Sequence, residues 1–127
     1  MRQARQSNRH QRRRAQRRGR LAEWFCLWYL QLRGWRILAR DWRCPSGEID
    51  ILARRGSVLA IIEVKSRQEI DAAASALTAR QRRRIARAAE AFLVSRPDLA
   101  LLDPRFDLML VAPHRLPRHW PGAWGAD

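Results

Sequence analysis

Two apolar segments joined by a short polar link constrain the fold of this chain most. Residues 48–53 read EIDILA, residues 58–67 read VLAIIEVKSR, and the link between them is RRGS. Segments rich in Ile, Val and Leu on either side of a short link with a glycine are typical of a β-hairpin inside a sheet. Asp50 and Glu63 lie in these segments, where a carboxylate without a partner costs several kcal/mol. The hairpin therefore predicts a partner for these charges, either a cation or a metal ion.

The geometry of a hairpin brings its polar residues together. A link centred on the Arg55–Gly56 bond places Asp50 opposite Ile61 and diagonal to Glu63. Lys65 is the only lysine in the chain, and it shares a face with Glu63 because strand side chains two residues apart point the same way. We therefore expect Asp50, Glu63 and Lys65 to converge. The opposite face would carry Ile49, Ile51, Ile62 and Val64.

Carboxylates that lie close together predict a chemistry. Two such groups repel each other, so that either one takes a proton or a divalent cation lies between them. A hard ion such as Mg²⁺ or Mn²⁺ lowers the pKa of a bound water and polarises a phosphoryl oxygen. The Lys65 ammonium can orient that water or stabilise the developing charge, which points to phosphodiester hydrolysis. Alternatively, Glu63 and Lys65 form an ion pair on an exposed sheet and Asp50 is solvated.

The segment before the hairpin predicts a helix and a short strand. Apolar residues at helical spacing begin at about residue 19, and Gly34 ends the run as a C-cap. Glu23 shares a stripe with Cys26, Leu27 and Leu30, so we expect it to point at the interior or at a groove beside it. Residues 36–42 then predict a strand and residues 43–47 a turn, with Gly47 at positive φ and Glu48 facing solvent.

The segment after the hairpin predicts a helix and a final strand. Thr78 and Gln81 fit a capping box that opens a helix through about residue 94, with Ile85, Ala89 and Phe92 as its inner face. Pro97 ends this helix. Residues 105–113 predict the last strand, and the segment from His114 onward is expected to be irregular. The expected order is therefore α, β, β, β, α, β.

Charge predicts the class of partner. The chain has 26 Lys plus Arg against 12 Asp plus Glu, for a net charge of +14, and it will attract polyanions such as nucleic acid. Residues 1–18 hold eight arginines and no acid, so they predict a disordered tail. This tail is either a solvated leader or a phosphate-binding arm that includes Arg17 and Arg18. The outer face of the second helix carries Arg80, Arg82, Arg83, Arg84 and Arg87, which could also contact phosphates.

Cysteine usage and apolar runs bear on the cellular location. Cys26 and Cys44 have neither the spacing nor the neighbours of a zinc site. The longest apolar run, residues 21–32, is far short of the roughly 20 residues that span a bilayer. We therefore expect a cytoplasmic protein that does not enter membranes, with a single domain over residues 19–127.

Four short motifs, in order, carry a resemblance to a known family. They are GRLAE, GEIDILA, IIEVKSR and RFD, and together they span residues 19–107. The chain resembles the YraN-like family of bacterial proteins, which are predicted endonucleases similar to archaeal Holliday-junction resolvases. The resemblance implies a restriction-endonuclease-like α/β core of the PD-(D/E)XK type, with a mixed central sheet flanked by helices. It also implies that Asp50 and Glu63 bind the metal, that Lys65 is catalytic and that Glu23 is an additional catalytic and metal-binding acid.

Some positions depart from the family pattern. Asp41 stands where Asn is usual, and Gln81 stands where Lys is common, so we expect neighbouring Arg80 or Arg82 to take over phosphate contact there. We expect Asp107 to pair with Arg105 rather than to bind metal.

The function expected from the resemblance is metal-dependent cleavage of DNA. By analogy with the resolvases, we also expect a preference for branched or junction DNA and assembly as a homodimer. The sequence leaves two alternatives open: a non-catalytic nucleic-acid-binding protein on the same fold, and a basic RNA- or ribosome-associated protein.

Overall fold

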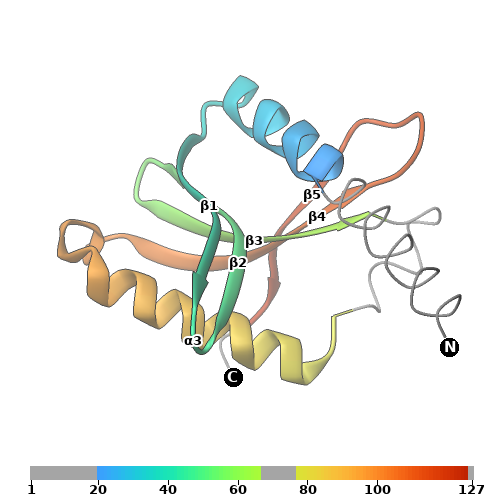
Figure 1. The fold of residues 1–127 in the computed structure, drawn as a ribbon. Helices are drawn as coiled ribbons and strands as arrows, with labels where there is room; N and C mark the ends of the chain where they lie inside the picture. Colours follow the sequence, from blue (N-terminus) through green and yellow to red (C-terminus); the bar gives the residue numbers. More distant parts are fainter. Residues whose placement is uncertain (1–19, 67–76, 126–127) are drawn as a thin grey trace, which may run out of the picture.

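A single mixed sheet with a helix on each face organises the protein. The computed structural model describes residues 20–66 and 77–125, in which five strands are hydrogen-bonded in the order β1-β2-β3-β4-β5. The strands are β1 (Arg36–Cys44), β2 (Gly47–Arg55), β3 (Val58–Ser66), β4 (Asp103–Val111) and β5 (Arg118–Trp124). A helix over residues 20–32 covers one face and α3 (Ala79–Ser95) the other (Figure 1). The predicted α/β class and mixed central sheet are confirmed.

The sheet is mixed because one pair of neighbouring strands is parallel. β3 and β4 run side by side in the same direction, with Val58 opposite Asp103, while the other neighbours are antiparallel. A parallel pair needs a long connection, and this one contains α3. The connection therefore places α3 across the face that holds Ile49, Leu52, Leu59 and Ile61.

The β2–β3 hairpin has a tighter link than the sequence suggested. Arg55 pairs with Val58, so the loop is Gly56 and Ser57, and its centre is one residue later than we expected. Gly56 has φ +60, the conformation that the first position of a two-residue hairpin loop requires and that glycine adopts without strain. The predicted pairing of Asp50 with Ile61 is therefore wrong, since Leu52 lies opposite Ile61.

The helix over residues 20–32 ends as predicted. Gly34 has φ +86 and its N–H bonds the Gln31 carbonyl, while the N–H of Trp35 bonds the Leu30 carbonyl. These two bonds form the Schellman cap that a glycine after the last turn allows. The face that packs on the sheet carries Cys26, Leu27 and Leu30, the stripe that also includes Glu23.

The start and end of α3 also follow the sequence. The Thr78 hydroxyl accepts the N–H of Gln81, and the Gln81 side chain accepts the N–H of Thr78, so the capping box is complete. The buried side chains of α3 are Ile85, Ala88, Ala89 and Phe92. Pro97 begins a short 3₁₀ helix (Pro97–Leu99) directly after the C-cap, as its lack of an N–H favours.

Two sequence expectations near the sheet edges are wrong. Residues 118–124, expected to be irregular, form β5 on the edge of the sheet, where Pro121 and a register shift are tolerated. Gly47 is not a positive-φ turn residue but a buried position of β2. A Cβ there would lie 2.8 Å from the carbonyl oxygen of Arg84, so glycine is needed because the α3 backbone approaches β2 closely. Glu48 is exposed as expected and pairs with Arg43 at 3.3 Å.

Other expectations concern cysteines and membranes. Cys26 and Cys44 are both free thiols. Among residues 20–66 and 77–125, no helix is long and apolar enough to cross a membrane. The predicted tail, residues 1–18, lies outside the described residues.

Candidate active site

β2 and β3 separate at the start of β2, and a carboxylate occupies the gap. Their pairing ends at Ile51 and Ile62. In a continuing antiparallel ladder Val64 would lie opposite Ile49. Instead, the N–H of Val64 donates to Oδ2 of Asp50 over 2.8 Å. The Asp50 side chain thus takes the place of a backbone acceptor at the point where the strands diverge.

The divergence also reverses the orientation of one residue. We expected Ile49 and Ile51 on the same face, but Ile49 packs in the core beneath α3, while Ile51 packs in the core beneath the helix over residues 20–32. Val64 packs with Ile51, as predicted. The predicted face pattern therefore holds for β3 and fails for the beginning of β2, because that part of β2 no longer pairs with β3.

Glu63 and Lys65 form an ion pair beside this gap. Nζ of Lys65 lies 3.5 Å from Oε1 of Glu63, and the two side chains are only 14% and 17% exposed. Side chains alternate along β3, so both share the face of Ile61, which packs beneath α3. The alternative of a freely solvated pair on an exposed sheet does not fit this degree of burial.

Asp50 and Glu63 are two acids that affect each other's pKa. The pKa of Glu63 is raised to about 8, because burial, the charge of Asp50 and a hydrogen bond with Asp50 together outweigh the opposing effect of Lys65. Burial also raises the pKa of Asp50, although the Val64 N–H and the hydrogen bond with Glu63 oppose this. The pair therefore has more negative charge than its surroundings neutralise.

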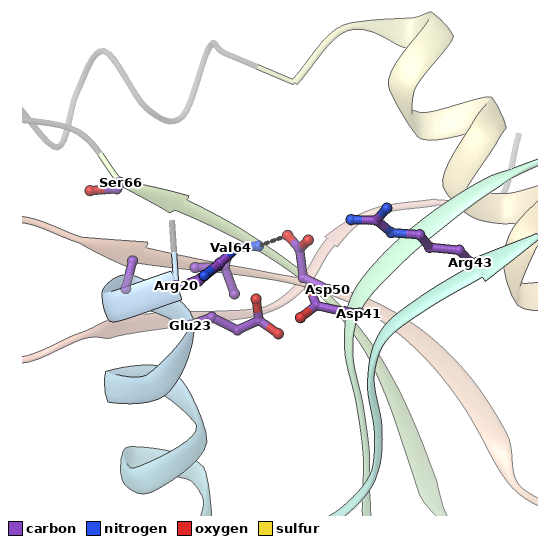
Figure 2. Close-up of a pocket in the computed structure, with 8 residues that line it drawn as sticks. Arg20, Glu23, Asp41, Arg43, Asp50, Val64 and Ser66 are labelled. Carbon is purple, nitrogen blue, oxygen red and sulfur yellow. Dashed lines mark hydrogen bonds between the residues drawn. The ribbon is translucent and has the colours of Figure 1, made fainter. Parts of the chain in front are cut away.

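Two further acids lie on the other side of Asp50. Glu23, from the helix over residues 20–32, and Asp41, from β1, line a hollow of about 240 Å³ together with Asp50 and Val64, and Figure 2 shows their carboxylates directed toward it. Arg20, Ala22, Arg43 and Ser66 complete the described lining. Burial raises the pKa of Glu23 to about 8, helped by a hydrogen bond with Asp41 and by the charges of Asp41 and Asp50. The inward orientation predicted for Glu23 is thus observed.

Asp41 is a site residue that the sequence reasoning missed. Its φ is +48, a left-handed conformation that Asn and Asp adopt more readily than other residues with a side chain. This backbone requirement explains why an Asn or Asp suits the position. The signal was present in the sequence as an Asp inside an otherwise strand-like segment.

The donor atoms at this site suit a hard cation. Oε1 of Glu23 is buried and has no hydrogen-bond partner among the described residues. Asp50 and Glu63 are neighbouring carboxyl groups of raised pKa, and Mg²⁺ is commonly held by one or two carboxylates. Within residues 20–66 and 77–125, however, no three His, Cys, Asp or Glu side chains are grouped closely enough to hold a metal ion. The residues therefore fit an ion bound by two carboxylates and not an enclosed cage.

The acids of the site also affect the pKa of the Cys26 thiol, which lies nearby. Burial raises the pKa of its thiol to about 12, and the charges of Asp50 and Glu23 contribute. Cys26 is therefore a neutral core residue rather than a nucleophile or a metal ligand.

The arginines of α3 form an exposed basic face. Arg80, Arg82, Arg83, Arg84 and Arg87 are all exposed, as expected for side chains that could contact phosphates. The α3 backbone at Arg84 contacts Gly47, three residues before Asp50, so this helix passes close to the strand that carries the site. Gln81 closes the capping box through its side chain. Arg17 and Arg18 lie outside the described residues.

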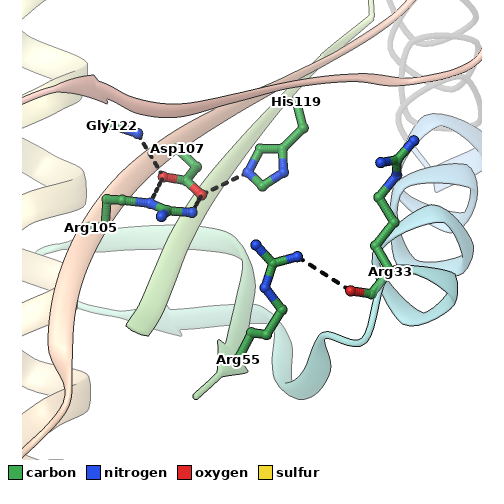
Figure 3. Close-up of polar contacts among 6 residues, drawn as sticks. All are labelled: Arg33, Arg55, Arg105, Asp107, His119 and Gly122. Carbon is green, nitrogen blue, oxygen red and sulfur yellow. Dashed lines mark hydrogen bonds and ion pairs between the residues drawn. The ribbon is translucent and has the colours of Figure 1, made fainter. Parts of the chain in front are cut away.

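Asp107 belongs to a separate structural network (Figure 3). It is fully buried and accepts bonds from Nε and Nη2 of Arg105, from the N–H of Gly122 and from Nε2 of His119. Burial alone would raise the pKa of Asp107, but these partners lower it overall. The expectation that Asp107 pairs with Arg105 is confirmed, and the network also ties β4 to β5.

Comparisons with known proteins identify relatives along most of the chain. The sequence model of the "Uncharacterised protein family UPF0102" matches residues 22–111. A UPF0102 protein of Paramagnetospirillum magneticum is 51% identical over 117 residues, which cover 89% of this chain and 91% of the relative. A UPF0102 protein of Rhodopseudomonas palustris (strain BisB5) is 54% identical over 99 residues, which cover 78% of this chain and 76% of the relative.

Proposed function

The chain belongs to the uncharacterised protein family UPF0102, and we propose that it is a metal-dependent endonuclease that hydrolyses phosphodiester bonds in DNA. The observation that carries the proposal is the arrangement of Asp50, Glu63 and Lys65 where β2 and β3 separate. We include in the proposal a restriction-endonuclease-like core of the PD-(D/E)XK type, because the two acids and the lysine occupy a diverging strand pair in a mixed sheet.

Each residue of the site would have a defined task. Asp50 and Glu63 would hold Mg²⁺ or Mn²⁺, and Glu23 would contact the water shell of the ion from the opposite side of the gap. When bound, the ion supplies a water of lowered pKa and polarises the phosphoryl oxygen. The Val64 N–H fixes the carboxylate of Asp50. Lys65 is held in place by its ion pair with Glu63 and would donate to the attacked phosphate or orient the water.

The basic surface would position the substrate. The exposed arginines of α3 would contact phosphates without reading sequence, and Arg17 and Arg18 would add contacts from the tail. A net charge of +14 supports attraction to a polyanion. Action in the cytoplasm remains a prediction from cysteine usage and apolar runs in the sequence. A preference for branched or junction DNA and a homodimer remain predictions from the resemblance.

A second candidate function has one observation in its favour. A nucleic-acid-binding protein without turnover would need no metal, and the described residues contain no group of three metal-ligating side chains. The charges at the site argue against this alternative, because a surface that only binds phosphates gains nothing from buried acids beside it. The raised pKa values of Glu23, Asp50 and Glu63 favour the endonuclease.

A cleavage assay distinguishes the two candidates. Purified protein is incubated with branched, single-stranded and duplex DNA in Mg²⁺, in Mn²⁺ or in EDTA. The endonuclease proposal predicts cleavage with either ion and none in EDTA. Binding to these DNAs without cleavage under any ion condition would support the non-catalytic alternative.

A further inference from the structure

The outward face of the helix over residues 20–32 is apolar. Its exposed side chains are Leu21 (58% exposed), Trp24 (56%), Phe25 (42%), Trp28 (50%) and Leu32 (66%). Successive residues lie 100° apart around a helix, so these five fall on a stripe about 100° wide. The other strongly exposed large apolar residues of the described chain, such as Val94 and Leu101, do not share this stripe. A concentrated patch of this kind marks a binding surface.

The stripe continues into a hollow that adjoins the candidate active site. Leu21 and Phe25 line this hollow of about 580 Å³ together with Val111 at the end of β4 and with Pro113 and Leu116 from the segment between β4 and β5. Its lining includes Ala22 and Ser66, and both residues also line the acidic hollow around Glu23 and Asp50. The two hollows are therefore neighbours, and one helix borders both.

The charges around the stripe indicate which partner it fits. Arg20 and Arg33 are exposed near the two ends of the helix, and Arg20 also lines the acidic hollow into which Glu23, the only acid on the helix, points. A second copy of the chain would bring like charges together at both ends, whether the two helices packed parallel or antiparallel. The complementary partner is a polyanion that presents flat apolar surfaces. Unpaired nucleobases on a phosphate backbone have both properties.

We propose that the stripe centred on Phe25 and Trp28, with the adjoining apolar hollow, binds the unpaired bases of a single-stranded nucleic acid segment. Trp24 and Phe25 already form an edge-to-face pair, with ring centroids 5.2 Å apart, which gives a rigid aromatic platform. Arg115 at the hollow would contact the backbone of the same strand. This inference rests on the proposed function, since it places unpaired bases next to the cleavage site, and it narrows the substrate to DNA with a single-stranded segment.

Binding measured in EDTA tests the inference without any cleavage. The probes are a labelled oligothymidylate, an abasic strand of equal length and charge, and a duplex of the same length. We expect the parent to bind the base-bearing strand about tenfold more tightly than the abasic strand, because base stacking on aromatic residues supplies an affinity of that order. Phe25→Ala should remove that difference, and Phe25→Trp should keep it. Leu101→Ala, which truncates an exposed apolar residue elsewhere, is the matched control.

Several outcomes would overturn the inference. Equal affinity of the parent for the base-bearing and abasic strands would do so, as would an unchanged preference in Phe25→Ala. Binding to phosphatidylglycerol vesicles that Phe25→Ala abolishes, without a base preference, would assign the stripe to a membrane surface. Self-association that Phe25→Ala abolishes, again without a base preference, would assign it to a second copy. If the protein prefers unpaired bases but never cleaves DNA, this inference is supported and the proposed function is contradicted.

Discussion

The N–H of Val64 donates to Oδ2 of Asp50 over 2.8 Å, so a side chain of β2 satisfies a backbone group of β3. The bond lies just beyond the last backbone pair of the two strands. It ties the position of Asp50 to the backbone of β3, whose next residues on either side, Glu63 and Lys65, are the other members of the proposed catalytic set. The separation of β2 from β3 is thus both what creates the gap and what orients the carboxylate within it.

This bond predicts a difference between two substitutions of Asp50. Asn retains an oxygen that can accept the Val64 N–H, whereas Ala leaves that donor without a partner. We expect Asp50→Asn to be more stable than Asp50→Ala by about 1–2 kcal/mol, the cost of an unpaired buried donor. Urea denaturation in EDTA measures this difference. Equal stability of the two variants would mean that the Val64 bond contributes nothing to the fold.

The raised pKa of Glu63 predicts how stability depends on pH. Its pKa is about 8 in the folded protein against an ordinary value of 4.5, so between these values the folded state binds a proton that the unfolded chain releases. Stability therefore falls as the pH rises from 4.5 to 8. Gln cannot ionise, so Glu63→Gln avoids the loss of stability that the parent suffers as the pH rises. The melting temperature of Glu63→Gln should therefore exceed that of the parent by about 5 °C at pH 8 and by less at pH 5. Thermal melts in EDTA at the two pH values test this, and a larger gain at pH 5 would contradict it.

The ion pair between Lys65 and Glu63 predicts that removing Lys65 will affect DNA cleavage but not metal binding. Removing the ammonium in Lys65→Ala leaves the carboxylates of Asp50 and Glu63 in place and lowers the positive charge beside them. We expect this variant to bind Mn²⁺ at least as tightly as the parent, while single-turnover cleavage of DNA falls by about a hundredfold or more. Calorimetric titration with Mn²⁺ and quenched-flow cleavage measure the two quantities. Parent-like cleavage by Lys65→Ala would remove Lys65 from the proposed mechanism.

The network in Figure 3 predicts a large loss of stability when it is broken. Asp107→Ala leaves the partly buried Arg105 guanidinium without its bidentate partner and removes the acceptor of Gly122 and His119. We expect a loss of about 3–5 kcal/mol. The control is Asp98→Ala, which breaks an exposed pair with Arg96 and should cost far less, because water screens an exposed ion pair. A loss no greater than that of the control would show that the network does not hold β4 to β5.

The sequence predicted those parts of the fold that depend on local signals. The capping box at Thr78, the glycine cap at Gly34 and the inward stripe of Glu23 are set by neighbours in the sequence, and all three are observed. The predictions failed where tertiary contacts decide. Gly47 is needed because α3 passes against β2, and β5 forms despite Pro121 because the neighbouring β4 offers an edge.

In the candidate site, too, local patterns were predicted correctly and the effects of tertiary contacts were not. Strand alternation correctly put Glu63 and Lys65 on one face, but it could not predict that β2 leaves β3 at Asp50 and that Ile49 turns toward the other core. The contribution of Asp41 depends on a left-handed backbone conformation and on contact with a distant helix. Neither can be derived from the spacing of residues along the chain.

The central claim is that Asp50 and Glu63 hold the ion that cleaves DNA, and one comparison tests it most directly. Cleavage in Mg²⁺ is measured for the parent, Asp50→Asn, Glu63→Gln and Glu48→Gln at saturating DNA. Glu48 is the matched control, since it is an exposed acid two residues from Asp50 on the same strand. We predict that Glu48→Gln cleaves like the parent, while Asp50→Asn and Glu63→Gln lose at least about a hundredfold in rate and still bind the DNA. Parent-like cleavage by Asp50→Asn or Glu63→Gln would contradict the account.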